Sequence, residues 1–228
     1  MITLLGIGHV FDIRKGVEHA IISRRPDIVC VELDRVRYQA LLDRTSKRSA
    51  PLVYKMLAAF QQRIARKYGS GVGQEMITAI ETAKKINAEV AFIDMDASIV
   101  FAKIWRAMSL KEKVKFIVGA FAGLFVGKET VEKELKRFEE RSDVYLEMFG
   151  NEFPTVKEVL IDERDRYMAD AIRKLSARYE NIIAVIGDGH IHGVEKLLDD
   201  LRPEVIRLSE LRSFGTVTYS FTLEYEGS

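Results

Sequence analysis

The sequence feature that most constrains the fold is a set of short apolar runs separated by segments with a helical pattern. The runs are "ITLLGIG" at residues 2–8, "DIVCVEL" at 27–33, "EVAFIDM" at 89–95, "NIIAVIG" at 181–187 and "EVIRLS" at 204–209. Continuous apolar runs of this length are typical of strands buried on both faces, which occur in parallel sheets covered by helices. The sequence therefore predicts an α/β fold with a mostly parallel central sheet flanked by helices.

A helical region from about residue 98 to 180 separates the third and fourth runs and is longer than an ordinary connection between parallel strands. Two residue pairs in it match the capping box, in which a hydroxyl and a carboxylate bond the free N–H groups at a helix start. These pairs are Ser109 with Glu112 and Thr155 with Glu158. We expect one domain over residues 1–228 with a helical insertion at about 98–150.

Other segments complete the expected fold. Residues 16–25, 35–67 and 74–87 carry helical patterns. Residues 216–226, "TVTYSFTLEYE", alternate between apolar and polar side chains and are rich in β-branched and aromatic residues. This pattern predicts a half-exposed C-terminal edge strand.

Composition limits the compartment and the partners. The formal net charge is +1, so no whole-chain field attracts nucleic acid, and no nucleic-acid partner is expected. The single cysteine, Cys30, rules out an intramolecular disulfide, which fits a reducing compartment. The longest apolar stretch, residues 116–126, is well short of the roughly 20 residues that span a bilayer. We expect a cytoplasmic protein, or the cytoplasmic domain of a membrane protein.

Polar side chains follow each of the first four predicted strands. Because ligands of parallel α/β sheets bind beyond the carboxyl ends of the strands, we expect these side chains to share one rim. They are His9, Glu32, Asp34, Asp94, Asp96 and His190.

Both His9 and His190 follow a Gly-x-Gly sequence, which allows three interpretations. A phosphate-binding loop needs a third glycine, but Phe11 and His192 stand in its place. Two histidines with one carboxylate are instead a common ligand set for Mn, Fe, Co or Zn, and a histidine oriented by a carboxylate is a metal-free general base. The third interpretation is that both histidines only bond locally at strand ends.

The helix at residues 155–175 has an apolar stripe that is interrupted by charged residues. The stripe consists of Val156, Val159, Leu160, Tyr167, Met168, Ala171, Ile172 and Leu175. The positions on this stripe between Leu160 and Tyr167 are occupied by Glu163 and Arg164. A charged pair on a buried face forms an internal salt bridge or reaches the rim, where Glu163 would act as a base and Arg164 would stabilise an oxyanion.

The motifs together resemble the TraB/PrgY family, within a larger group that includes GumN, the Tiki proteases and the erythromycin esterases. The resemblance rests on two G-x-x-H motifs, Glu32 in "VELD", "ERDRYMA" at residues 163–169 and "GQEMITAI" at 73–80. By spacing alone Glu75 is a first-turn partner of the helix dipole, and the resemblance makes it a site candidate. An arginine expected soon after Asp94 is absent.

The resemblance implies a metal-dependent, peptidase-like hydrolase that acts on peptides such as signalling pheromones. His9, His190 and Glu32 would bind Mn, Co or Zn, and Glu163 or Glu75 would position or deprotonate water. Two alternatives remain open: a metal-free esterase-like hydrolase, and a non-catalytic peptide-binding or regulatory domain. The resemblance also implies membrane association through segments outside these residues, and an apolar helix in the insertion allows a homo-oligomer contact.

Overall fold

A computed structural model describes residues 1–8, 13–42, 73–123, 147–148 and 150–214. Its centre is one sheet in which five strands run parallel, in the order β3-β2-β4-β1-β5. The strands are β1 (Ile2–Ile7), β2 (Ile28–Val31), β3 (Glu89–Phe92), β4 (Ile182–Gly187) and β5 (Glu204–Ile206). The five predicted strands and the parallel α/β class are confirmed.

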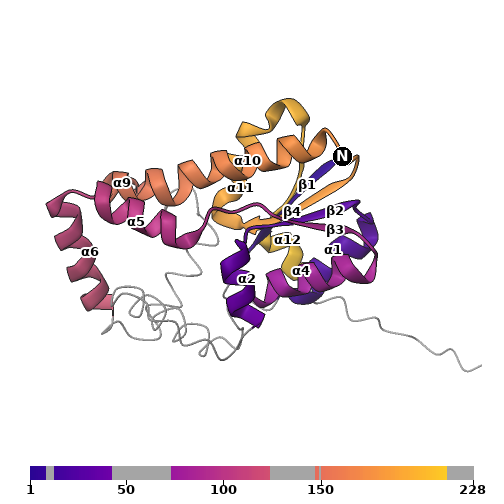
Figure 1. Cartoon of the computed structure of the whole chain (residues 1–228), viewed down its shortest axis with the longest axis horizontal. Coiled ribbons are helices and arrows are strands. Elements are labelled where there is room, and N and C mark those ends of the chain that lie inside the picture. Colours follow the sequence, from indigo (N-terminus) through magenta and orange to yellow (C-terminus); the bar gives the residue numbers. More distant parts are fainter. Residues whose placement is uncertain (9–12, 43–72, 124–146, 149, 215–228) are drawn as a thin grey trace, which may run out of the picture.

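Helices cover both faces of the sheet, which explains why the strands are apolar without alternation (Figure 1). One face packs on α1 (Arg14–Arg24), α4 (Gln74–Lys85) and α12 (Leu208–Phe214). The other packs on α10 (Glu163–Ser176) and α11 (Asp188–Leu197). Along β2, Val29 and Val31 face the first layer and Cys30 faces the second. The short helix α2 (Arg35–Leu42) follows β2.

Part of the expected helical insertion is described and lies at one end of the sheet. It contains α5 (Ala97–Ala107) and α6 (Leu110–Gly123), which extend away from the strands (Figure 1). They pack on α9 (Pro154–Lys157) and the π-helical turn η1 (Glu158–Asp162) around a small apolar cluster. The cluster is formed by Val100, Ile104, Met108, Val156 and Val159.

One capping box is confirmed and the other is wrong. Ser109 donates its backbone N–H to Glu112 at 2.8 Å, and Glu112 donates its own N–H to the Ser109 hydroxyl at 3.2 Å. Thr155 instead lies inside α9, because Pro154 already occupies the first turn, and the Thr155 N–H is donated to Glu112 at 3.2 Å. Glu158 pairs with Arg166 at 2.5 Å.

The predicted stripe on the 155–175 helix is wrong at Tyr167, which is 48% exposed. The buried positions of α10 are Arg164, Asp165, Met168, Ala169 and Ile172. The reason is η1, because a π-helical turn holds one residue more than an α-helical turn and shifts the facing residues accordingly. Sequence periodicity assumes 3.6 residues per turn throughout, so it cannot anticipate that shift.

Several predictions fall outside the described residues. They are the helical pattern from residue 43 to 67, the rest of the insertion from 124 to 146, and the edge strand at 216–226. In the segments that are described, no helix is both long and apolar enough to cross a membrane. The 3₁₀-helical turn η2 (Asp199–Leu201) leads into β5, which begins three residues later at Glu204.

Candidate functional site

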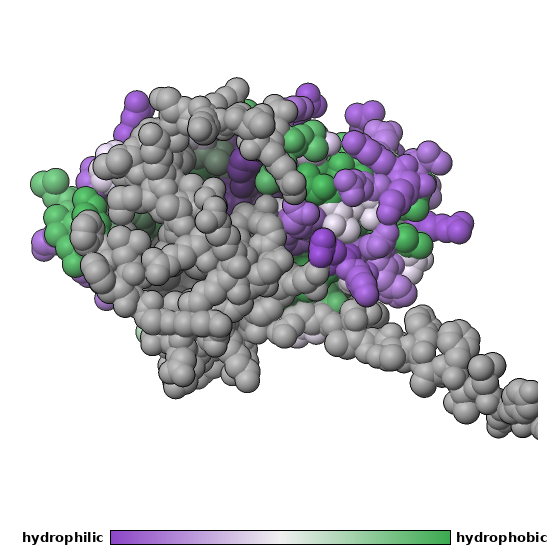
Figure 2. Space-filling view, turned by 90° about the horizontal axis from the view of Figure 1, so that it is seen from below, coloured by the Kyte–Doolittle hydropathy of each residue, from purple (hydrophilic) through white to green (hydrophobic). Residues whose placement is uncertain are grey.

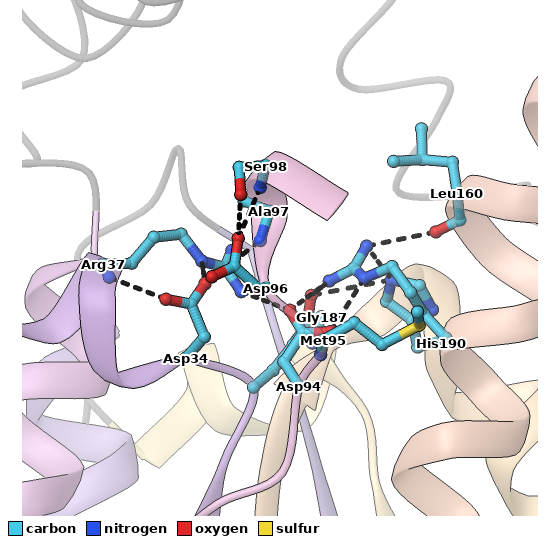
Figure 3. A network of polar contacts seen from close by, with 12 residues as sticks. Asp34, Arg37, Asp94, Met95, Asp96, Ala97, Ser98, Leu160, Gly187 and His190 are labelled. Atoms are coloured by element: carbon cyan, nitrogen blue, oxygen red, sulfur yellow. Dashed lines mark hydrogen bonds and ion pairs between the residues drawn. The ribbon is translucent and has the colours of Figure 1, made fainter. Parts of the chain in front are cut away.

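The site lies at the carboxyl edge of the sheet, where β2, β3 and β4 end. Val31 of β2 pairs with both Phe92 of β3 and Val185 of β4, so the three strands end at about the same level. Glu32 directly follows β2, Asp94 follows β3, and His190 occupies the first turn of α11 after β4. All three are buried, at 8%, 5% and 5% exposure. The strand order therefore brings together groups that lie far apart in the sequence (Figure 3).

The guanidinium of Arg164 is at the centre of these groups. It reaches the rim from the first turn of α10, directly after η1, and bonds both oxygens of Asp94, with Nε at 2.9 Å from Oδ1 and Nη2 at 2.8 Å from Oδ2. Nη2 also donates to Glu32, and Nη1 donates to the Leu160 carbonyl at 3.1 Å. A planar guanidinium can donate to both oxygens of one carboxylate in this way, and the ammonium group of a lysine cannot.

The two carboxylates bound by Arg164 are held from other directions as well. Glu32 accepts the backbone N–H of Gly187 at 2.5 Å, which ties the ends of β2 and β4 together. Asp94 accepts the Met95 N–H at 2.7 Å and is also bound by Arg37 from α2. Arg37 donates through Nε to Asp34 at 2.5 Å. The network is continuous and runs through Glu32, Arg164, Asp94, Arg37 and Asp34 (Figure 3).

His190 is fixed between an acid and a guanidinium. Its Nδ1 lies 2.5 Å from Oδ1 of Asp165, and its Nε2 lies 3.0 Å from Nη1 of Arg164. Since a guanidinium can only donate, we assign Nε2 as the acceptor and place the ring proton on Nδ1, where it is donated to Asp165. Nε2 is also 3.6 Å from Oε1 of Glu32.

Glycines allow the close approach of these groups. A Cβ at Gly193 would lie 1.9 Å from Oδ2 of Asp165, so only glycine leaves room for that carboxylate against α11. A Cβ at Gly187 would lie 3.1 Å from Oε2 of Glu32, and one at Gly6 would lie 2.3 Å from Oδ1 of Asp188. Gly6 and Gly187 have no positive φ. These two glycines provide space for the neighbouring side chains.

Burial and charge shift the pKa of two groups. Burial raises the pKa of Asp165 above its usual range, although the contact with His190 opposes this shift. For Arg164, burial alone would lower the pKa, but the bonds and charges of Asp94 and Glu32 raise it overall. Arg164 therefore stays charged and balances the buried carboxylates.

The structure brings Glu32, Arg164 and His190 together and pairs Glu163 with a residue outside this group. His9 lies outside the described residues, and Ile7, at the end of β1, pairs with Gly187 at the end of β4. Glu163 is turned to α5, where both carboxylate oxygens lie 2.6 Å from Nζ of Lys103. Glu75 is 2% exposed in the first turn of α4.

Two site residues, Asp165 and Arg37, were missed by the sequence analysis. Asp165 stands next to Arg164 in "ERDRYMA", so the motif contained it, but its contact with His190 depends on the helix phase after η1. Arg37 belongs to an unremarkable short helix. The arginine that was expected soon after Asp94 is absent from the sequence. Arg37 and Arg164, which belong to other elements, provide the positive charge beside Asp94 instead.

The described residues do not fit a metal ion as they are arranged. No group of three or more His, Cys, Asp or Glu side chains within the described ranges is placed to hold one. Oε1 of Glu32, both oxygens of Asp94 and the lone pair of His190 face Arg164, which occupies the position that a shared cation would need. A metal bound by Glu32 and His190 would require Arg164 to move away.

Fold and site together define a parallel α/β domain with a buried arginine and a His–Asp pair at the carboxyl edge of its sheet. The profile of the TraB/PrgY/gumN family matches residues 1–209. The chain belongs to this family.

Relatives are found in archaea and mammals. An uncharacterized protein of Methanocaldococcus jannaschii is 30% identical over 88% of this chain and 54% of its own length. The TraB domain-containing protein of Mus musculus is 25% identical over 85% of this chain and 61% of its own length. The chain thus spans little more than half of the curated relatives that it matches.

A solved structure of ChaN of Campylobacter jejuni with cofacial heme binding aligns with 90% of this chain and 79% of its own chain. The identity is 14% and the TM-score is 0.38. A likeness at this level says nothing about a ligand of the present chain.

Proposed function

We propose that the rim is the active site of a hydrolase that cleaves an amide or ester bond in a peptide-like substrate. The observation that carries the proposal is the contact of His190 with Asp165, which leaves Nε2 directed toward Arg164 and Glu32. A histidine held by a carboxylate through one nitrogen is the arrangement of a general base, and a nearby guanidinium can stabilise a developing oxyanion. The peptide-like substrate is taken from the family resemblance.

In the proposed reaction, water displaces Nη1 of Arg164 from Nε2 of His190 and gives its proton to that nitrogen. The water oxygen forms a bond to the carbonyl carbon, and the carbonyl electron pair moves onto its oxygen. Arg164 stabilises that negative charge, while Asp165 stabilises the imidazolium. When the bond to the leaving amine or alcohol breaks, the leaving group takes the proton from Nε2, so the site returns to its starting state.

The metal-dependent form of the proposal assigns His9, His190 and Glu32 as ligands of Mn, Co or Zn. It requires Arg164 to leave Glu32, as the geometry above implies. Histidine ligands commonly bond a carboxylate through their second nitrogen, and the contact of His190 with Asp165 has this form. This contact is the one observation that favours the metal-dependent form.

The test is turnover by the full chain of p-nitrophenyl butyrate and of a defined synthetic peptide library analysed by mass spectrometry. We expect His190→Gln and Asp165→Asn to lower kcat/KM by roughly 10²- to 10⁴-fold, because base catalysis contributes about that much. The matched controls are His192→Gln and Asp170→Asn, since both residues are exposed on the same two helices. Their kcat/KM should equal that of the wild type.

Metal analysis and chelator treatment separate the two forms of the reaction. Turnover that survives chelation supports the base mechanism, and turnover lost to chelation and restored by Mn or Co supports the metal-dependent form. Full activity of His190→Gln would show that the proposed base is wrong. Saturable peptide binding without any turnover would identify the chain as the non-catalytic binding domain instead.

A further inference from the structure

Helix α6 turns an apolar face away from the rest of the protein. Leu110, Val114, Ile117 and Val118 are 81%, 60%, 49% and 61% exposed. At about 100° per residue these four positions fall within an arc of about 100°, so they form one continuous face. Figure 2 shows hydrophobic side chains at the end of the molecule where Figure 1 places α6. Contiguous exposed apolar surface of this kind is typical of a contact site.

Lysines border this face on both sides. Lys111 and Lys113 lie just beyond its opposite edges on the helix, and Lys115 lies further round on the side of Lys111. Lys113 is held in place by Trp105 of α5, with its Nζ 5.6 Å from the ring centroid. The acidic residue of the described helix, Glu112, is buried and bonds Ser109 and Thr155. The apolar face is therefore bordered by a lysine at each edge.

The start of α6 is anchored, so the direction of the face is fixed. Glu112 connects the helix start to α9 through Thr155, and Phe116 packs on the cluster between α5 and α9. Lys115 adds a contact to Glu152 at 2.6 Å. Glu112 and Phe116 thus face the protein, and the apolar face of Leu110, Val114, Ile117 and Val118 faces outward. This is the reverse of an ordinary surface helix.

We propose that α6 docks in the plane of an anionic lipid surface, with its apolar face in the acyl boundary and its lysines at the phosphate level. An apolar face with flanking lysines is the pattern of interfacial helices. The lysines favour this occupant over a second copy of the same face, because a symmetric dimer would bring the two lysine rows together. The contact needs no membrane-spanning helix.

The test is co-sedimentation of the full chain with vesicles of phosphatidylcholine alone and of phosphatidylcholine with 30% phosphatidylserine, at about 20 and 200 mM salt. We expect binding to the anionic vesicles that weakens at the higher salt, because salt screens surface charge. Val114→Gln with Val118→Gln should weaken binding at least tenfold. Lys111→Gln with Lys113→Gln should weaken it on the order of twentyfold, at roughly fivefold per lysine.

Matched controls use exposed residues far from α6. Ile22→Gln with Val36→Gln removes apolar groups of similar exposure, and Lys174→Gln with Lys196→Gln removes two charges. Both control proteins should bind the anionic vesicles like the wild type, and all variants should keep the wild-type circular dichroism.

Three results would overturn the proposal. The first is no binding of the wild type to anionic vesicles. The second is a dimer that the valine variant dissolves, which would assign the face to a second copy. The third is a valine variant that binds vesicles normally but has a lower unfolding midpoint, because the face would then be packed against the chain itself.

Discussion

At the scale of single residues, the pair of Asp165 and His190 depends on a residue that takes no part in it. The carboxylate of Asp165 lies against the backbone of α11 where Gly193 has no side chain. Asp165 is buried, and burial raises its pKa, so the bond to His190 offsets part of the cost of holding a charge there. The room that Gly193 leaves beside α11 therefore fixes the position of Asp165 and, through it, the orientation of the His190 ring.

Gly193→Ala should displace Asp165 from His190 without unfolding the protein. The new methyl group would overlap Oδ2 of Asp165, and the carboxylate can turn away because it ends a side chain. We expect a loss of about 1–3 kcal/mol in the free energy of unfolding and a fall in any hydrolytic activity toward that of Asp165→Asn. Nitrogen chemical shifts of His190 should show that Nδ1 has lost its acceptor.

The control for this change is Gly119→Ala, because Gly119 also lies in a helix but a Cβ there would meet nothing within 4 Å. That variant should gain about 0.5–1 kcal/mol from helix propensity and leave His190 unchanged. An unchanged His190 spectrum in Gly193→Ala would contradict the role given to Gly193.

At the scale of elements, the start of α6 depends on the carboxylate of Glu112, which accepts four hydrogen bonds, from the backbone N–H and the hydroxyl of both Ser109 and Thr155. The pKa of Glu112 is lowered, chiefly because its carboxylate accepts the backbone N–H of Ser109. Burial opposes this lowering, and the bonds from the Ser109 hydroxyl and the Thr155 N–H increase it. Because the same carboxylate bonds α9, it joins the insertion to the helix that carries η1.

Glu112→Gln should therefore destabilise the protein in a pH-dependent way. The folded-state pKa lies below the ordinary value of a glutamate carboxyl, so the ionised carboxylate stabilises the protein above that pH. This contribution is lost as the pH falls through the folded-state pKa. We expect a loss of about 1 kcal/mol at pH 7 and a much smaller one at pH 3, measured by urea unfolding.

Glu152→Gln is the matched control, because Glu152 pairs with Lys115 on the surface. It should change the free energy of unfolding little at either pH. A deficit of Glu112→Gln that is equally large at pH 3 and pH 7 would show that ionisation is not the cause.

Elements were predicted better than the contacts between them. Apolar runs identified all five strands, since burial on both faces leaves a direct mark on composition. The strand ends then predicted that Glu32, Asp94 and His190 share a rim. The residues of α10 that face the sheet could not be predicted. The π-helical turn η1 rotates the positions that follow it, and no sequence pattern marks such a turn. Neither could Arg37, whose partner Asp94 is 57 residues away.

At the scale of the whole molecule, the single cysteine reports on the integrity of the three layers. Cys30 is 0% exposed on the interior strand β2, beneath α10 and α11. Burial raises the pKa of its thiol to about 12. A buried thiol in this position reacts only when the layers separate.

Labelling of Cys30 by Ellman's reagent at pH 8 should be at least about a thousandfold slower than labelling of free cysteine, because a stable domain is open for a small fraction of the time. The rate should rise with urea along the same slope as global unfolding. Iodoacetamide followed by mass spectrometry provides an independent measurement. Fast labelling in the absence of urea would mean that the layer of α10 and α11 opens by itself.

The strand order has a consequence for how the chain is made. β1 leaves the ribosome first, but its strand partners in the described part of the chain are β4 and β5, and β4 begins at Ile182. β4 must then insert between β1 and β2. At about 5–20 residues per second, the first apolar strand waits roughly 10–35 seconds for a neighbour. Chaperone supply during translation, more than the stability of the finished sheet, should limit the yield of folded protein.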